Sequence, residues 1–278
     1  MEPKYEITVA GLGKIYVINA PFNEQLKVFR KNGIKPMSIK DKAYAMVHAP
    51  LESDVVQNGN RTSASVIYQV GKKPLFVKNL FLVSDSRLAD AAVEAHRKGE
   101  EFIVPYENSR KIKTQMQKEI SKRIAIEQRT VFELPNKEDF LISPMQNWDV
   151  ARGIYENLAD DYFSFLENNS GKNIESIKFI TPSPGHIKEV KKPFLRQVWA
   201  CGLVDDANLD SDDCGGRGLY YDYGLRGVLI GSAVGGDEKI KTYTLAQVIQ
   251  QVKESCININ MLKDYKINLI ADLEARLK

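Results

Sequence analysis

Residues 200–237 read ACGLVDDANLDSDDCGGRGLYYDYGLRGVLIGSAVGGD, and this stretch decides how the rest of the chain is interpreted. Its 38 residues include no Lys, Glu, Gln, Met or Trp, although these five types make up 65 of the 278 residues. With ordinary mixed usage, a gap of this length would occur in about one chain in a hundred. The composition of the stretch is therefore unusual.

The five missing amino acids share one property, which is that all their codons end in a purine. Randomising the adenines of AAY codons can produce Asp, Gly, Tyr, Ser, Cys, Leu, Val, Ala, Arg and Asn, but none of the missing types. The segment is built from that alphabet. The alternative interpretation is a turn-rich loop that happens to lack long charged side chains.

The flanks of the segment carry a resemblance to a known family. LRQVWACGL at residues 195–203 precedes the Asp-, Gly-, Ser- and Tyr-rich part, and YGLRGVL at residues 223–229 closes it. Together they resemble the variable region of proteins diversified by diversity-generating retroelements, most of all the archaeal, Nanoarchaeota type. The motif match is confined to residues 195–229 of the chain.

Variable proteins of that family have a C-type lectin fold, in which irregular strands hold the diversified side chains on one exposed face. The resemblance implies an α+β fold with short twisted antiparallel strands and flanking helices, in a C-type-lectin-like domain over residues 1–240 that includes the variable region near 200–227. Two features depart from the family's pattern. A long C-terminal helix is predicted in a helical segment over 241–278, where the family's chain would end, and residues near 100–140 look like a helical insertion in the first domain.

The resemblance further implies a receptor-like, non-enzymatic protein with a hypervariable ligand-binding site in residues 202–224. The residues expected to contact the ligand are Asp205, Asp206, Asn208, Asp210, Ser211, Asp212, Asp213, Cys214, Arg217, Tyr220, Tyr221, Asp222 and Tyr223. Tyrosine offers large, rigid contact area at low entropic cost, and Asp and Ser offer adaptable hydrogen bonding. The excess of Asp favours a basic or cationic ligand surface.

A binding face that tolerates changes in its surface residues needs a fixed scaffold beneath it. Alternation along the flanking strands predicts that apolar residues there point inward or anchor the ends of the segment. These residues are Trp199, Val198, Leu203, Leu225, Val228 and Ile230.

Metal and cofactor chemistry is not expected. The three His are scattered, and none of Cys201, Cys214 and Cys256 lies in a Cys-x-x-Cys pair, so zinc-ligand spacing is absent. The run Asp206-x-Asn208-x-Asp210 resembles the start of a calcium loop, but the glycine and the glutamate that complete that loop are missing. Cys201 and Cys214 could form a disulfide only if their Cα atoms lie within ~7 Å.

Periodicity and end signals predict the secondary structure elsewhere. The expected helices lie between Pro21 and Asn32 and over residues 39–48, 87–98, 107–130 and 148–167, with a last one from Thr244 onward. The expected strands are 7–9, 15–18, 63–70, 75–83, 174–181, 194–204 and 219–234, of which 75–83 should be central.

The helix predicted over residues 107–130 gives the alternative function. Seven Lys and Arg side chains lie mostly away from its apolar stripe, so this face could line a nucleic-acid backbone. The simpler interpretation is a solvated face that covers an apolar stripe. The net charge of +3 is too close to zero for a protein whose whole surface tracks nucleic acid, so we expect no nucleic-acid partner.

The expected partner is a protein or surface ligand, for example on another cell, and the C-terminal near-heptad stripe would allow oligomerisation. No stretch is apolar enough for membrane insertion, and residues 1–20 do not have the pattern of an export signal. An enzyme is the third hypothesis, because catalytic proteins share the lectin-like fold, but no nucleophile and base can be named. The family suggests display on a cell surface or virion, and the sequence leaves the location open.

Overall fold

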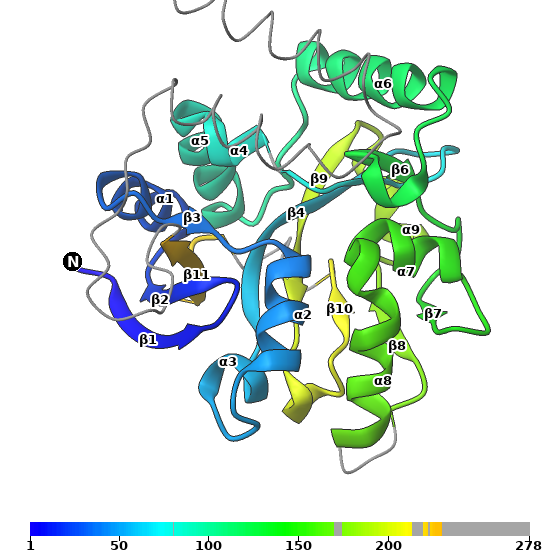
Figure 1. Ribbon diagram of the computed structural model, residues 1–278. Coiled ribbons are helices and arrows are strands. Elements are labelled where there is room, and N and C mark those ends of the chain that lie inside the picture. The colour runs from blue at the N-terminus through cyan, green and yellow to red at the C-terminus, as the bar shows by residue number, and fades with distance from the viewer. Residues whose placement is uncertain (80, 170–173, 213–218, 222, 230–278) are drawn as a thin grey trace, which may run out of the picture. The chain divides into compact units, whose positions relative to one another are not determined.

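A computed structural model describes residues 1–79, 81–169, 174–212, 219–221 and 223–229 of the chain (Figure 1). The described residues belong to one compact unit, which spans residues 1–234. The predicted C-terminal helix and Ile230 lie outside the described residues. Helices and strands alternate along the compact unit, which is the α+β class predicted from the sequence.

The described elements are the following. The strands are β1 (Lys4–Val9), β2 (Gly13–Asn19), β3 (Lys35–Pro36), β4 (Asn60–Tyr68), β5 (Leu75–Val77), β6 (Val131–Glu133), β7 (Phe140–Ile142), β8 (Ile177–Ile180), β9 (Phe194–Ala200), β10 (Leu209–Asp210) and β11 (Gly224–Leu229). The α-helices are α1 (Phe22–Lys31), α2 (Ile39–His48), α3 (Asp54–Gln57), α4 (Phe81–Ser84), α5 (Ser86–Arg97), α6 (Tyr106–Ser121), α7 (Trp148–Tyr155), α8 (Ala159–Asn169) and α9 (Pro184–Val190). Three 3-10 turns complete the set, η1 (Ile126–Gln128), η2 (Glu156–Leu158) and η3 (Leu203–Asp205).

The strands pair into one mixed sheet with the order β1-β2-β11-β4-β9-β10-β8-β7. β3 pairs with β11, and β5 lies between β4 and β6. The strand β11, which follows the segment of interest, therefore inserts between the N-terminal hairpin and β4. Every residue of β4 is buried, which makes β4 the central strand.

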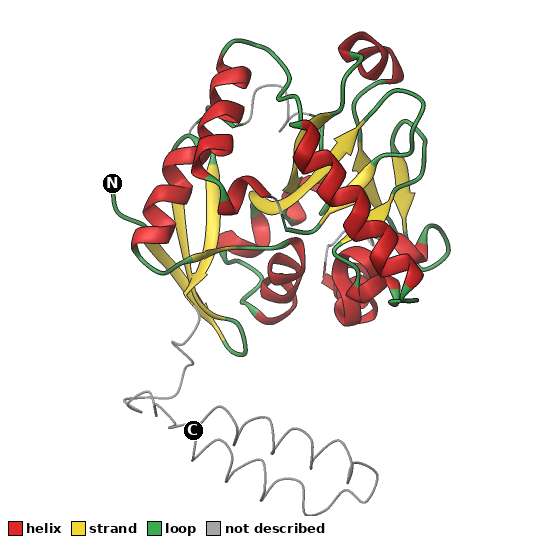
Figure 2. Cartoon of the chain, turned by 90° about the horizontal axis from the view of Figure 1, so that it is seen from above, coloured by secondary structure: helices red, strands yellow, loops and turns green. Residues whose placement is uncertain are grey.

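Apolar side chains cover both faces of this sheet. One cluster joins β4, β8 and β9 to α2, α7 and α8. A second joins β2, β11 and the outer part of β4 to α1 and α5. Figure 2 shows the sheet between helices, and because large apolar area is removed from water on both sides, the strands have a rigid base.

Several local predictions are confirmed. The hairpin β1–β2 and the helix α1 lie where the sequence placed them. The helix α2 spans residues 39–48 and begins with a capping box in which Ser38 and Asp41 exchange hydrogen bonds. These elements depend on signals within a few residues of sequence.

Other predictions are wrong. The expected strand 75–83 is only β5, and residues 81–84 form α4, so this strand is short and β4 takes the central place. The helix predicted over 107–130 ends at Ser121, shortly before Arg123 takes a positive φ of 54°. The strand predicted over 194–204 ends at Ala200, and the strand predicted over 219–234 begins only at Gly224, while residues 230–234 lie outside the described residues.

The helix predicted over residues 148–167 is broken at Glu156, whose φ of 60° and ψ of −132° belong to a region that favours glycine. Helix α9 was not predicted, although Ser183 caps it and Pro184 occupies its first turn.

Candidate functional site

The segment that follows β9 begins as a tightly closed loop. The Cys201 amide donates to the Asn208 carbonyl at 2.9 Å, and η3 lies between them. At Gly202, a Cβ atom would lie 2.1 Å from the Gln57 carbonyl oxygen, so glycine is required by close packing against the chain after α3. Leu203 and Leu209 are buried and anchor the two ends of the loop.

Ser211 is a correction to the predicted ligand-contacting set. Its side chain is fully buried, and its hydroxyl donates to the Ile180 carbonyl at 2.8 Å. The Tyr68 hydroxyl lies 2.7 Å from the Ser211 hydroxyl oxygen. A side chain enclosed in this way holds β10 to β8 and cannot contact a ligand.

The neighbouring Asp212 is held through its backbone. The guanidinium of Arg196, which is 4% exposed, donates to the Asp212 carbonyl. Arg196 also pairs with the Glu101 carboxylate at 2.5 Å, and His186 Nε2 lies 2.8 Å from that carboxylate. The Asp212 side chain is 47% exposed, and its carboxylate lies 3.8 Å from Arg196 Nη1.

The tyrosine-rich end of the segment is held in the same manner. The Phe22 amide donates to the Leu219 carbonyl at 2.8 Å. Arg61 donates to the Tyr221 carbonyl at 2.8 Å, and the Gln25 side-chain amide donates to the Tyr223 carbonyl.

Arg61 and Gln25 are both fully buried and contact each other at 2.9 Å. Arg61 also donates to the Ala20 carbonyl at 3.1 Å. We call Arg61, Gln25 and Arg196 the framework clamp. All three bind backbone carbonyls of the segment, so these hydrogen bonds do not depend on which side chain stands at residues 212, 221 and 223.

The tyrosine side chains themselves lie toward solvent. Tyr221 is 40% exposed and Tyr223 is 50% exposed. Tyr220 stacks on Tyr221 with ring centroids 4.3 Å apart, and Tyr223 packs edge-on against both Tyr221 and Trp199. The rings form a continuous aromatic surface, with the Arg61 guanidinium 5.7 Å from the Tyr223 ring centre.

The remaining predicted site residues have mixed placements. Asp205 is exposed and Asp206 is half-buried. Asn208 accepts from the Lys178 amide at 2.9 Å, and Asp210 accepts from the Asp212 amide at 2.7 Å, so both also serve local structure. The other four predicted residues, Asp213, Cys214, Arg217 and Asp222, lie outside the described residues.

The predicted scaffold largely agrees with the structure. Val198, Leu203, Leu225 and Val228 are buried. Trp199 is half-buried, and it is both a scaffold and a surface residue, because its ring also contacts Tyr223.

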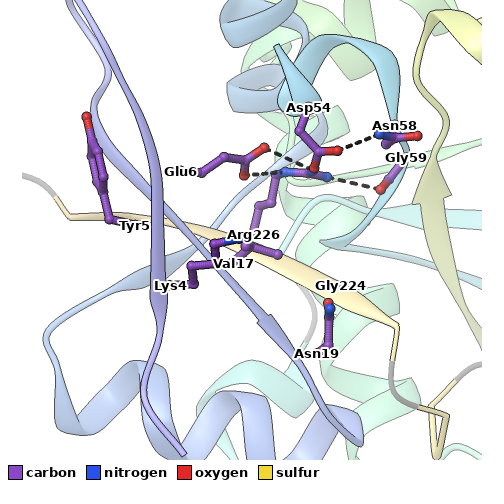
Figure 3. Close-up of a pocket in the computed structure, with 10 residues that line it drawn as sticks. All are labelled: Lys4, Tyr5, Glu6, Val17, Asn19, Asp54, Asn58, Gly59, Gly224 and Arg226. Atoms are coloured by element: carbon purple, nitrogen blue, oxygen red, sulfur yellow. Dashed lines mark hydrogen bonds and ion pairs between the residues drawn. The ribbon is translucent and has the colours of Figure 1, made fainter.

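An arginine that the sequence analysis missed fixes the strand after the segment (Figure 3). Arg226 is 2% exposed and donates to both Glu6 carboxylate oxygens, at 2.7 and 3.1 Å, and to Asp54. It also donates to the Gly59 carbonyl at 3.0 Å.

These groups line a cavity of about 490 Å³ between β1, α3 and β11. Burial acts to raise the pKa of Asp54, but the Arg226 charge and the hydrogen bonds at this carboxyl together outweigh it and lower that pKa. Lys42 is also buried, and burial together with the Arg226 charge lowers its pKa well below the usual value. Its Nζ donates to the Val55 and Asn58 carbonyls. This end of the sheet is thus a satisfied polar network beside the aromatic surface.

The sequence carried one indication of these buried arginines, which is a charged residue within an otherwise apolar strand. Arg196 lies in FLRQVWA and Arg226 in GLRGVL, and both side chains are buried. A buried arginine is stable only when its donors are satisfied, so each implies a set of acceptors nearby.

Metal ligands are not brought together in the described part of the chain, where no group of three His, Cys, Asp or Glu side chains could hold an ion. Burial raises the pKa of the Cys201 thiol to about 12, so this thiol is protonated and unreactive near neutral pH. No helix within the described ranges has the length and apolarity needed to cross a membrane.

Comparison with known proteins identifies the fold. No protein family model and no curated protein matches the chain. One solved structure that it resembles is reported with the words "Accommodation of massive sequence variation in Nanoarchaeota by the C-type lectin fold". The TM-score is 0.51 at 14% sequence identity, over 77% of this chain and 96% of the other. The protein therefore has a C-type lectin fold, as the motif at 195–229 predicted.

Proposed function

We propose that this protein is a receptor-like, ligand-binding protein whose hypervariable site is the exposed surface of residues 202–224, diversified by a retroelement. The observation that carries the proposal is a coincidence of two independent features. The segment with the codon-restricted composition is the segment that the framework clamp holds through backbone carbonyls. A site whose side chains change from copy to copy needs such an attachment.

The chemistry of the surface supports a protein or surface ligand as the partner. Tyr221 and Tyr223 provide rigid contact area that a binding interface can use without a large loss of side-chain entropy. The exposed Asp205 and the half-exposed Asp212 add negative charge, which favours a basic partner. The positions that vary are then Asp205, Asp206, Asp212, Tyr220, Tyr221 and Tyr223 among the described residues.

We assign binding rather than catalysis to this surface. Among the described residues of this surface, the exposed side chains are Val204, the carboxylate of Asp205 and the phenols of Tyr221 and Tyr223. Cys201 is held as a protonated thiol. Turnover by the purified protein on a panel of hydrolase substrates, together with a stoichiometric metal, would contradict this part of the proposal.

The test is the DNA sequence of the flanking locus. We expect a near-repeat of the DNA that encodes residues 200–227, with mismatches only at adenines of the repeat, and a reverse transcriptase gene close by. A locus without a repeat, or a repeat whose mismatches fall equally on all four bases, would contradict diversification and leave an ordinary acidic loop.

A basic surface beside α6 supports nucleic acid as a second candidate ligand. Two adjoining cavities share Gln69 and Lys72 at the turn between β4 and β5. The lysines that line them are Lys72, Lys73, Lys113, Lys137 and Lys188. Within this group Lys73 is paired with Glu133, and Lys113 donates to Gln69.

Electrophoretic mobility of random-sequence RNA and DNA at increasing salt tests this candidate. Binding that weakens steeply with salt, and that is lost in a Lys72→Gln, Lys113→Gln, Lys188→Gln triple variant, would support it. The matched control is a triple variant at three lysines away from this surface, Lys14, Lys27 and Lys31. An absence of binding at low salt would eliminate it.

A further inference from the structure

A second polar cavity lies away from the candidate binding surface, between the start of α2 and the end of α7. It has a volume of about 290 Å³ and is lined by three lysines, Lys35 on β3, Lys40 on α2 and Lys78 directly after β5. Asn79 and Ser38 add polar groups, and Phe76 and Ile154 form the apolar part of the wall. None of these residues belongs to the segment 202–224.

The carboxylate of Glu156 lies between two of the lysines. Lys40 Nζ is 2.7 Å from one oxygen, and Lys78 Nζ is 3.0 Å from the other. Burial acts to raise the pKa of Glu156, but the hydrogen bonds and charges of the two lysines together outweigh it and lower that pKa. The protein's own carboxylate therefore marks a position where the cavity stabilises an anion.

Glu156 reaches this position at a backbone cost. Its φ of 60° and ψ of −132° lie in a region where a Cβ is unfavourable, and the conformation interrupts the helical run between α7 and α8. Strain of this kind costs on the order of 1–3 kcal/mol and is relieved when the residue is free to move. The ion pairs with Lys40 and Lys78 that hold the carboxylate are thus opposed by the strained backbone conformation of Glu156.

Removing the Glu156 carboxylate from the cavity would leave a net positive site. Lys78 is only 14% exposed, and its one other acceptor is the Glu127 carbonyl at 2.7 Å. The other acidic lining residue, Asp41, is engaged with the Ser38 amide in the cap of α2. Three lysines would then line the cavity, and the capped Asp41 would be the remaining carboxylate of the lining, so an anion bound there would be stabilised by their charge.

We propose that this cavity binds a phosphate-class dianion, which displaces the Glu156 carboxylate from between Lys40 and Lys78. A dianion is required because a monoanion would have to compete with a carboxylate that is already attached to the chain. Two negative charges and three or more acceptor oxygens match Lys35, Lys40 and Lys78 better than one carboxylate does. The proposal is independent of the ligand-binding function assigned to residues 202–224.

Thermal unfolding of the full chain in inorganic phosphate, against chloride at equal ionic strength, tests the site. We expect phosphate to raise the unfolding temperature of the wild-type protein, because a ligand that binds only the folded state stabilises it. Glu156→Gly removes the competing carboxylate and accepts the positive φ, so its phosphate affinity should be ~tenfold higher. Lys40→Met should lose the response, and the exposed Lys27→Met should keep it.

Two further arms make the outcome decisive. Vesicles that contain phosphatidic acid, compared with phosphatidylcholine vesicles, distinguish a lipid phosphate from a soluble one, since only a lipid site would sediment the protein with the first. The Lys78→Met variant should lose phosphate binding as measured by ³¹P line broadening. A wild-type protein with no phosphate-specific response, or an equal response in Lys40→Met and Lys27→Met, would overturn the proposal.

Discussion

The strand β9 and the segment that follows it are both fixed against the central sheet, but by different atoms. In β9, Leu195, Gln197 and Val198 are buried and their side chains interlock with β4 and its helices. In residues 212–223, Arg196, Arg61 and Gln25 reach the backbone carbonyls, and the side chains of Tyr221 and Tyr223 lie toward solvent. In the strand the fold depends on side-chain identity, and in the segment it depends on the backbone.

This difference indicates which positions of the chain tolerate substitution. A change in β9 alters packing in a close-packed interior, where even one methylene is felt. A change at an exposed position of the segment leaves the clamp intact, because the acceptors are main-chain oxygens that every residue carries. The buried side chains of the segment are exceptions because they are enclosed, namely Leu203, Ala207, Leu209, Ser211 and Leu219.

Loss of the clamp should have the largest effect. Arg61→Leu would leave the carbonyls of Ala20 and Tyr221 and the Gln25 amide oxygen without their donor. Buried polar groups that lose a charged partner are costly, so we expect the free energy of unfolding to fall by about 3 kcal/mol or more. Urea denaturation measures this loss in the free energy of unfolding.

The exposed Arg97 supplies a matched control, and Arg97→Leu should change the free energy of unfolding by less than about 0.5 kcal/mol. A cost below about 1 kcal/mol for Arg61→Leu would mean that the segment is held by something other than the clamp.

The next largest effect concerns pH. His96 on α5 is 1% exposed, and burial, reinforced by the charges of Arg196 and Arg61, lowers its pKa from 6.5 to about 3. The unfolded chain therefore binds a proton between pH 6.5 and 3 that the folded chain does not. Stability contributed by neutral His96 is complete above pH 6.5 and is lost as pH falls toward 3, by up to about 1.4 kcal/mol per pH unit.

His96→Leu removes this group without removing a partner, because neither ring nitrogen forms a hydrogen bond. Free energies of unfolding measured at pH 6.5 and pH 5 should differ by about 2 kcal/mol more in the wild type than in the variant. Parallel pH profiles would show that His96 does not remain neutral between the two arginines.

A smaller effect is expected at the start of the segment. Gly202→Ala places a methyl group against the Gln57 carbonyl, and overpacking of this kind costs about 1–3 kcal/mol. Gly185→Ala is the control, because its nearest neighbour would be the Ser183 hydroxyl at 3.8 Å. A thermal shift of equal size in both variants would mean that the loop after β9 is not closely packed on residues 57–58.

Local signals in the sequence were sufficient for parts of the fold. The helix α2, with its Ser38 cap, and the hairpin β1–β2 were placed correctly because their determinants lie within a few residues. The break at Glu156 could not be foreseen, since Lys40 and Lys78, which draw its carboxylate out of the helical path, come from α2 and from beyond β5.

The candidate site was predicted as a segment but not as a geometry. Composition identified residues 202–224, yet it could not separate the enclosed Ser211 from the exposed Tyr221, because the codon argument applies equally to both. The clamp was missed for a different reason. Arg61 and Arg196 belong to strands whose partners are fixed only when β4, β9 and β11 come together.

The most direct test of the account exchanges side chains at exposed and enclosed positions of the segment. The triple variant Asp205→Ser, Tyr221→Ser, Tyr223→Ser changes only exposed side chains, and Ser211→Tyr changes one that is buried. Both changes stay within the alphabet of the segment. Urea denaturation should show a loss below about 1.5 kcal/mol for the triple variant and above about 3 kcal/mol for Ser211→Tyr. If the triple variant were as destabilised as Ser211→Tyr, the segment would be held by its side chains, and the central claim would be wrong.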